Sequence, residues 1–305
     1  MGRLLQQLGT ANAMIGDTDA AISFLQQALV LQEKLHTSCG EAGAQPLVNT
    51  LHAAGQVMQQ IGDFDGALHY LQRVLRMKQE LERQRQEQQQ QQQSSIAAPH
   101  SNDAVLGSFP VTGHANTTSA SIAATLHELG MVHGNRGDTD AALRCLSESL
   151  AMDWALHGHD AVRPDIAATL YQLGVLYNIE GDMVLALRYC QQSLDMDVAL
   201  HGDGVDHPDV ASALHNAGLL LNATGDYEQG VRHLQRALDM KRRLYSAGDA
   251  SAGRQARDEH PSIAATDRAL ATLMLDKASL HANPTNPNST AAAAPRRRKR
   301  WWQRH

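Results

Sequence analysis

Histidines, aspartates and glycines occur in three patterns that could support chemistry. The segment 201–207, HGDGVDH, combines the residue types of a metal-binding loop, although it lacks the spacing and the bidentate glutamate of an EF-hand. An RGD tripeptide at 136–138 matches the integrin-binding sequence of secreted proteins, and histidines recur at positions 52, 127 and 215. What each pattern can do depends on the element that carries it.

The Gly-Asp pair of the RGD tripeptide is one of five. The dipeptide stands at 16–17, 62–63, 137–138, 181–182 and 225–226. Such recurrence, in register with the surrounding residues, is the signature of stacked repeats. The glycine supplies a left-handed helix end, and the aspartate caps the following helix. The sequence therefore favours a turn between two helices over an integrin-binding or phosphate-binding loop.

Two columns of small residues accompany these turns. A glycine stands seven residues before each turn, and a small residue stands just after it: Gly9, Gly55, Gly130, Gly174 and Gly218, then Ala21, Ala67, Ala142, Ala186 and Gly230. Because a glycine inside a helix costs about 1 kcal/mol relative to alanine, we expect a second helix to pack closely against the glycine column. Each unit is predicted to be a helix of roughly 13–15 residues, a tight turn and a longer helix.

Composition agrees with an all-helical, stacked fold. Apolar residues make up 43% of the 305 residues, but aromatic residues only 4%, which favours helices over a β-sandwich or barrel. Three cysteines without a CxxC pair predict neither a disulfide framework nor a zinc site and favour a reducing compartment. No run of apolar residues is long enough for a membrane span. We therefore expect a cytoplasmic protein.

Residues of the fourth unit carry a resemblance to a known family. Leu170, Leu173, Gly174, Tyr177 and Ala186 match the tetratricopeptide repeat pattern. The Pro-Asp openings at 164–166 and 208–210 look like the 42-residue variety found in kinesin light chains and nephrocystin-like proteins. The resemblance implies an all-α fold, a right-handed α-solenoid of helix-turn-helix repeats.

The resemblance and the composition together predict the following order. Repeats one and two occupy 1–83, a Gln-rich disordered insertion 84–120, repeats three to five 121–245, a loop 246–260, a degenerate capping helix 261–280, and a disordered linker with a basic tail 281–305. No polar capping helix precedes the first unit, which leaves self-association through that unit open.

By the resemblance, the inner surface of the solenoid is lined by the first helix of each unit and binds a peptide segment of a partner protein. In units three to five its ligand-facing positions are His127, Glu128, Asn135, Tyr171, Gln172, Val175, Asn178, His215, Asn216, Leu219 and Asn222. Unit two contributes His52, Gln56 and Gln59. Amide side chains suit pairing with an extended backbone because each offers a donor and an acceptor. Solvated helix surface is the alternative interpretation.

Other functions find less support. Units stack too far apart for His52, His127 and His215 to share one zinc ion, and the 201–207 segment is better explained as a linker that caps the next helix, so no metal or cofactor is expected. The sequence holds no Walker A loop, HExxH or GxSxG motif and no paired-carboxylate constellation, which argues against an enzyme.

A basic tail offers a separate route to partners. The tail consists of Arg296, Arg297, Arg298, Lys299, Arg300, Trp301 and Trp302. It could act as a nuclear import signal, bind a membrane surface, contact nucleic acid, or merely solubilise the chain end. The alternative to peptide capture is therefore a targeting module driven by this tail, and a nuclear location would follow from an import signal.

Overall fold

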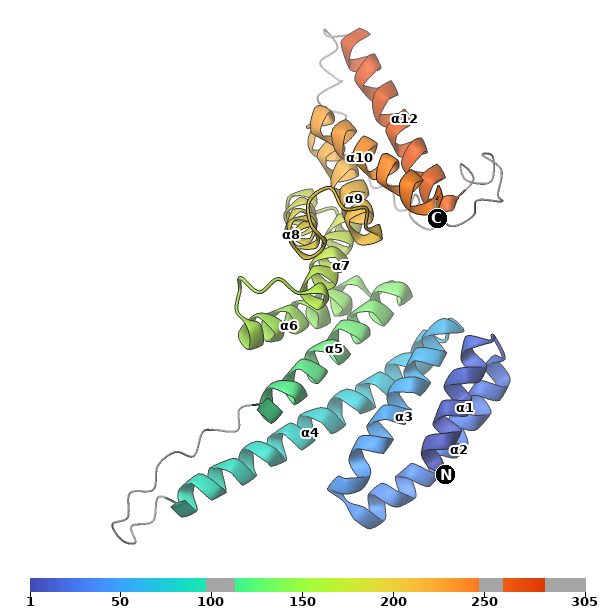
Figure 1. Cartoon of the computed structure of the whole chain (residues 1–305), viewed down its shortest axis with the longest axis vertical. Coiled ribbons are helices and arrows are strands. Elements are labelled where there is room, and N and C mark those ends of the chain that lie inside the picture. Colours follow the sequence, from blue (N-terminus) through green and yellow to red (C-terminus); the bar gives the residue numbers. More distant parts are fainter. Residues whose placement is uncertain (97–112, 247–259, 283–305) are drawn as a thin grey trace. The chain divides into compact units, whose positions relative to one another are not determined.

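The computed structural model describes residues 1–96, 113–246 and 260–282, and these residues form helices joined by short turns (Figure 1). The helices are α1 (Gly2–Met14), α2 (Thr18–Cys39), α3 (Glu41–Gln60), α4 (Phe64–Ile96), α5 (Gly113–Arg136), α6 (Thr139–His157), α7 (Pro164–Glu180), α8 (Met183–His201), α9 (Pro208–Thr224), α10 (Tyr227–Ser246) and α12 (Pro261–Ala282).

The helices pack in sequential pairs, α1 with α2, α3 with α4, α5 with α6, α7 with α8 and α9 with α10. Within two compact units, Met1–Asp160 and Ala161–His305, each second helix also packs against the first helix of the next pair. Buried leucines and alanines from both helices form the core. The all-α fold of repeated helix pairs predicted from the sequence is thereby confirmed.

The Gly-Asp dipeptides form the turn inside each pair. In the fourth repeat Gly181 has φ +93°, which only glycine adopts without strain, and Asp182 Oδ1 accepts a hydrogen bond from the Leu185 amide at 3.0 Å. The four other aspartates accept the equivalent amide hydrogen bond at 2.9–3.2 Å. The RGD tripeptide at 136–138 is therefore a helix end followed by a cap.

The glycine column lies where the two helices of a pair approach most closely. A Cβ on Gly130 would stand 2.6 Å from Leu146 Cγ and 3.3 Å from the carbonyl oxygen of Ala142. The other four glycines face the same positions of their own second helices. The first helices α7 and α9 have 17 residues each, longer than the sequence pattern predicted. Both begin at a proline, which suits the first helical turn.

Two lysines each join the second helix of a repeat to the helix that follows it. Lys78 Nζ on α4 donates to Thr125 Oγ1 at 2.6 Å and to the Ser121 carbonyl at 2.9 Å on α5. Lys241 Nζ on α10 makes the same two contacts to Thr266 and Ser262 on α12. Both receiving helices carry the sequence SIAAT, at 121–125 within α5 and at 262–266 near the start of α12, and both boundaries follow a chain insertion. α12 therefore contacts repeat five through the same kind of lysine contact by which α5 contacts repeat two.

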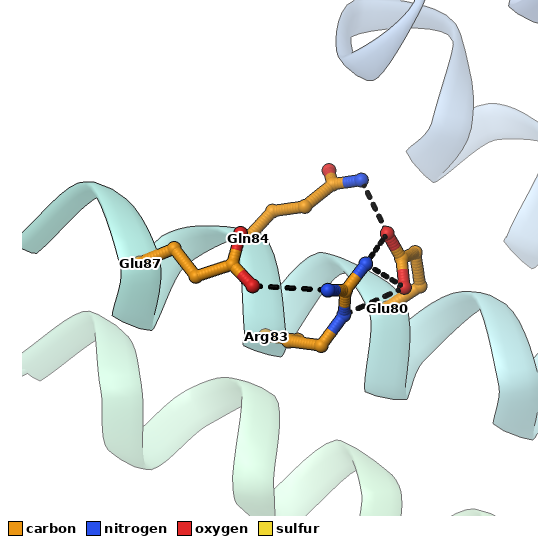
Figure 2. A network of polar contacts seen from close by, with 4 residues as sticks. All are labelled: Glu80, Arg83, Gln84 and Glu87. Carbon is orange, nitrogen blue, oxygen red and sulfur yellow. Dashed lines mark hydrogen bonds and ion pairs between the residues drawn. The ribbon is translucent and has the colours of Figure 1, made fainter.

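Helices extend into both ends of the expected insertion 84–120. α4 continues to Ile96 and α5 begins at Gly113, whereas 97–112 lie outside the described residues. Figure 2 shows the reason on α4: Arg83 bonds Glu80 on one side at 2.7 Å and Glu87 on the other at 2.9 Å, and Gln84 also bonds Glu80. Side-chain pairs three and four residues apart stabilise a helix, and α4 also packs against α5.

The last described helix occupies the segment expected to form the cap. α12 packs against α10 and, through fewer residues, against α9. Its exposed side carries Met274 and Leu275 as well as Asp267. Most of the loop expected at 246–260 and nearly all of the linker and tail expected at 281–305 lie outside the described residues.

Candidate functional site

In the compact unit Met1–Asp160, predicted binding positions on α5 make contacts inside the repeat array. Glu128 Oε2 lies 2.5 Å from His52 Nε2 on α3, and its other oxygen accepts a hydrogen bond from Gln56 Nε2 at 3.5 Å. His127 is half-buried, and Asn135 is exposed near the end of α5. Glu128 therefore joins two neighbouring first helices, and its carboxylate is partly used within the array.

In the second unit, α7 and α9 present the predicted positions on one shared face. Asn216 Nδ2 on α9 donates a hydrogen bond to Tyr171 Oη on α7 at 2.8 Å. Burial raises the pKa of Tyr171, so the phenol stays protonated at neutral pH. The contact fixes both side chains at the boundary between repeats four and five. We call the part of this surface formed by Tyr171, Gln172, Val175, Asn178, Asn216 and Leu219 the α7–α9 face.

A hollow of about 210 Å³ opens on the α7–α9 face. It is lined by Gly174, Val175, Asn178, Ile179, Cys190, Asn216, Leu219 and Leu220. Val175, Asn178, Asn216 and Leu219 are four of the residues predicted to face a ligand. They are half-buried, and their side chains surround one apolar depression whose polar side-chain groups are two amides. The structure thus brings together predicted residues of two consecutive repeats.

Cys190, on α8, lies beneath the hollow and is fully buried. Burial raises the pKa of its thiol to about 12, so the thiol is protonated at neutral pH. Cys190 was not predicted as a site residue, although the sequence carries a signal for it. Sixteen residues after each glycine of the column stand Leu25, Leu71, Leu146, Cys190 and Leu234, so that four repeats carry leucine and the fourth carries cysteine.

His215, on α9, contacts α12. Its Nδ1 is 3.0 Å from Thr266 Oγ1, which also accepts from Lys241 Nζ at 2.9 Å. Burial, together with the positive charge of Lys241, lowers the pKa of His215 to about 4, and burial lowers the pKa of Lys241 to about 8. The imidazole is therefore neutral at pH 7 and is part of the contact between repeat five and α12.

Two other predicted positions, Gln172 and Asn222, are not among the residues that line the hollow. Gln172 is half-buried on α7. Asn222, near the end of α9, is half-buried, and its Oδ1 is buried with no hydrogen-bond donor among the described residues. Such an acceptor gains from any donor that reaches it.

The histidine-containing segment 201–207 forms the linker into α9. His207 Nδ1 accepts a hydrogen bond from the Asp209 amide at 3.3 Å and so caps the helix. The His201 and His207 rings stack with their centroids 3.4 Å apart, and a ligand atom of each lies within 4.8 Å of one of Asp209. Hydrogen bonding and stacking within the linker therefore account for both histidines.

The remaining predictions concern other parts of the chain. On α1, Leu4 and Leu8 are 61% and 46% exposed. Self-association through the first repeat stays a prediction. The tail residues 296–302 lie outside the described residues, so targeting through the tail also stays a prediction. In the described part of the chain, no helix is both long enough and apolar enough to cross a bilayer.

Family models agree with this architecture. Three models, each described as a tetratricopeptide repeat, match residues 47–82, 127–197 and 165–243. A comparison with curated proteins found no significant match.

Solved structures show the same fold at low sequence identity. BtubC (BKLC) from P. vanneervenii matches with a TM-score of 0.59 and 18% identity over 83% of this chain and 85% of that chain. A kinesin light chain from Podosopora anserina with nearly identical TPR-like repeats matches with a TM-score of 0.54 and 15% identity over 79% and 95%. The apo form of RapI matches with a TM-score of 0.58 and 10% identity over 90% and 85%. At these identities the similarity concerns the fold alone.

Proposed function

Because the chain belongs to the tetratricopeptide repeat family, we propose that it is a non-catalytic protein-interaction scaffold that binds an extended peptide segment of a partner on the α7–α9 face. The observation that carries the proposal is the hollow shared by two consecutive repeats and flanked by Asn178 and Asn216. Repeat arrays commonly bind partners on the surface formed by successive equivalent helices.

The chemistry of the face supports a peptide as the ligand. Each asparagine offers both a donor and an acceptor, so it can pair with the N–H and C=O of an extended backbone. None of the residues that line the hollow is charged, which favours a neutral stretch over an acidic or basic one. The two amides lie on neighbouring helices and can therefore contact successive residues of one segment.

The proposal can be tested with a phage-displayed library of random peptides and the full chain as bait. We expect enriched peptides to bind the wild-type chain, and binding to weaken at least tenfold when Asn178→Ala and Asn216→Ala are combined, because the backbone pairing is lost. Arg188→Ala with Arg232→Ala is the matched control, since both arginines are exposed on second helices and lie outside the face.

Two outcomes would contradict peptide binding on this face. One is the absence of any enriched peptide, and the other is a set of peptides that bind the double asparagine variant as tightly as the wild-type chain. Repeating the measurement with the chain that lacks residues 296–305 separates the face from the tail. Peptides that lose all binding without the tail support the tail-driven alternative.

A further inference from the structure

The residue beneath the hollow differs between the fourth repeat and the others. In the other four repeats a leucine packs against the glycine column, as Leu146 does against Gly130. In repeat four Cys190 Sγ occupies this position and lies 2.5 Å from where a Cβ on Gly174 would stand. The helices thus approach as closely as in the other repeats, but the side chain that fills the space behind them is smaller.

The smaller side chain lies beneath the hollow on the α7–α9 face. Cys190, Gly174 and Leu220 are buried and form the floor of the hollow. Ile179 at the margin is 53% exposed, so the hollow opens to the surface. Protein interiors are normally filled at close to crystal density, and an unfilled apolar space with a surface opening can accept a side chain from outside.

Size and polarity narrow the class of occupant. At about 210 Å³ the hollow is smaller than the roughly 300–1,000 Å³ of most small-molecule sites. Apart from Asn178 and Asn216, its walls are aliphatic, with Val175, Ile179 and Leu219. A charged or strongly polar side chain would lose hydration there without a partner of opposite charge. An aliphatic side chain, branched or unbranched, suits the small volume, the apolar walls and the absence of a charged partner.

We propose that the hollow beneath the α7–α9 face is an anchor pocket that receives one leucine, isoleucine or methionine side chain of the bound peptide. The proposal rests on the proposed function, since it names the residue class that the peptide must carry. Asn178 and Asn216 hold the backbone beside the anchor, and Cys190 gives repeat four a pocket at a position where a leucine fills the other repeats. Burial of one such side chain strengthens binding by about tenfold to a hundredfold.

The decisive variant is Cys190→Leu, which restores the leucine of the other four repeats. Because those leucines pack against a glycine at the same register, the variant should fold, and its melting temperature should be equal to or above that of the wild-type chain. Cys190→Ala is the matched control, because it removes the thiol and keeps the hollow open.

Binding is measured by isothermal titration with a peptide enriched from the library and with the same peptide carrying alanine at its aliphatic anchor. We expect the anchor-to-alanine change to weaken binding at least tenfold for the wild-type chain and for Cys190→Ala. For Cys190→Leu, the intact peptide should bind at least tenfold more weakly than to the wild-type chain, and the anchor-to-alanine change should have little further effect. This non-additivity identifies a direct contact.

The outcomes separate the pocket from the proposed function. If enriched peptides depend on Asn178 and Asn216 but share no aliphatic residue, or if Cys190→Leu binds them unchanged, the anchor pocket is wrong and peptide binding stands. If no peptide is enriched, both are wrong. Should Cys190→Leu fail to fold, Val175→Phe covers the hollow from its half-buried margin, and unchanged affinity for that variant would also overturn the proposal.

Discussion

At the scale of single residues, the contact between His215, Thr266 and Lys241 shows how one buried hydroxyl connects two basic side chains. Thr266 Oγ1 accepts from the lysine and lies 3.0 Å from the histidine nitrogen. Lys241 is only 5% exposed. A protonated imidazole beside this ammonium would be both desolvated and repelled, so the histidine stays neutral.

We predict that His215 titrates with a pKa of about 4 in the folded chain. Its pKa in the unfolded chain is about 6.5, so the unfolded state binds more protons between these values and folding stability falls as the pH decreases from about 6.5 to 4. Lys241→Met removes the neighbouring charge and should raise the pKa of His215. Histidine NMR titration of the two proteins measures both values.

For this prediction, a His215 resonance that titrates near 6.5 in the wild-type chain would show that the imidazole is solvated. An unchanged pKa in Lys241→Met would show that burial alone sets it. Urea unfolding of the wild-type chain at pH 7 and at pH 5 gives an independent check, because the stability at pH 5 should be the lower of the two.

The sequence predicted individual site residues where they follow the repeat register. Val175, Asn178, Asn216 and Leu219 all line the hollow, and each was expected to face a ligand from the resemblance to tetratricopeptide repeats. Cys190 was not predicted, because it stands on a second helix and because its role depends on its small size relative to the leucine of the other repeats. The partner of His215 was not predicted either, because Thr266 is 51 residues away along the chain.

At the scale of helices, the repeat columns predicted which helices pair, but not where each helix ends. The five Gly-Asp turns lie at the expected positions because the glycine conformation and the aspartate cap are both local. The helix ends away from these turns depend on contacts that the recurring residues of the repeat do not specify. α4 extends to Ile96 through side-chain pairs of its own and through contacts to α5. The sequence placed the insertion from residue 84 and left open whether its glutamine-rich start continues the helix.

We predict that Arg83→Glu loosens the end of α4. The substitution places like charges three and four residues apart, next to Glu80 and Glu87, which disfavours the helix. Hydrogen exchange of the amides between residues 84 and 92 should become faster, while the melting temperature of the repeats stays unchanged because these side chains are exposed.

Arg83→Lys serves as the control for the Arg83 prediction, because it keeps the charge and should keep the slow exchange. The effect of Arg83→Glu should also shrink at 1 M salt, where charges on an exposed helix are screened. Equal exchange rates in Arg83→Glu and the wild-type chain would show that packing against α5 alone holds this end.

At the scale of the molecule, the chain consists of two compact units, Met1–Asp160 and Ala161–His305, each with its own core. Leu51 is fully buried within the core of α1 to α4, and Leu214 is 2% exposed within the core of α8 to α10. In repeat arrays each repeat contacts its neighbours only, so stability is close to a sum of local terms. Damage to one core should therefore remain in its unit.

We predict that Leu51→Ala reduces hydrogen-exchange protection in α1 to α4 and leaves α9 and α10 protected. The loss should correspond to about 2–5 kcal/mol in the affected unit, as for other buried leucines. Leu214→Ala should give the reverse pattern, which makes the two variants controls for each other. A uniform loss of protection over both units in either variant would show that the chain unfolds as one body.

The lysine contacts at Lys78 and Lys241 have a consequence for how an array of this kind can change during evolution. Each lysine donates to a serine carbonyl and a threonine hydroxyl of the SIAAT sequence in the next helix. The polypeptide between the joined helices contributes nothing to these hydrogen bonds, and the entropy cost of a longer connection grows only slowly with its length. At such boundaries the connecting segment can gain or lose residues during evolution while the stacking of the helices on either side is kept.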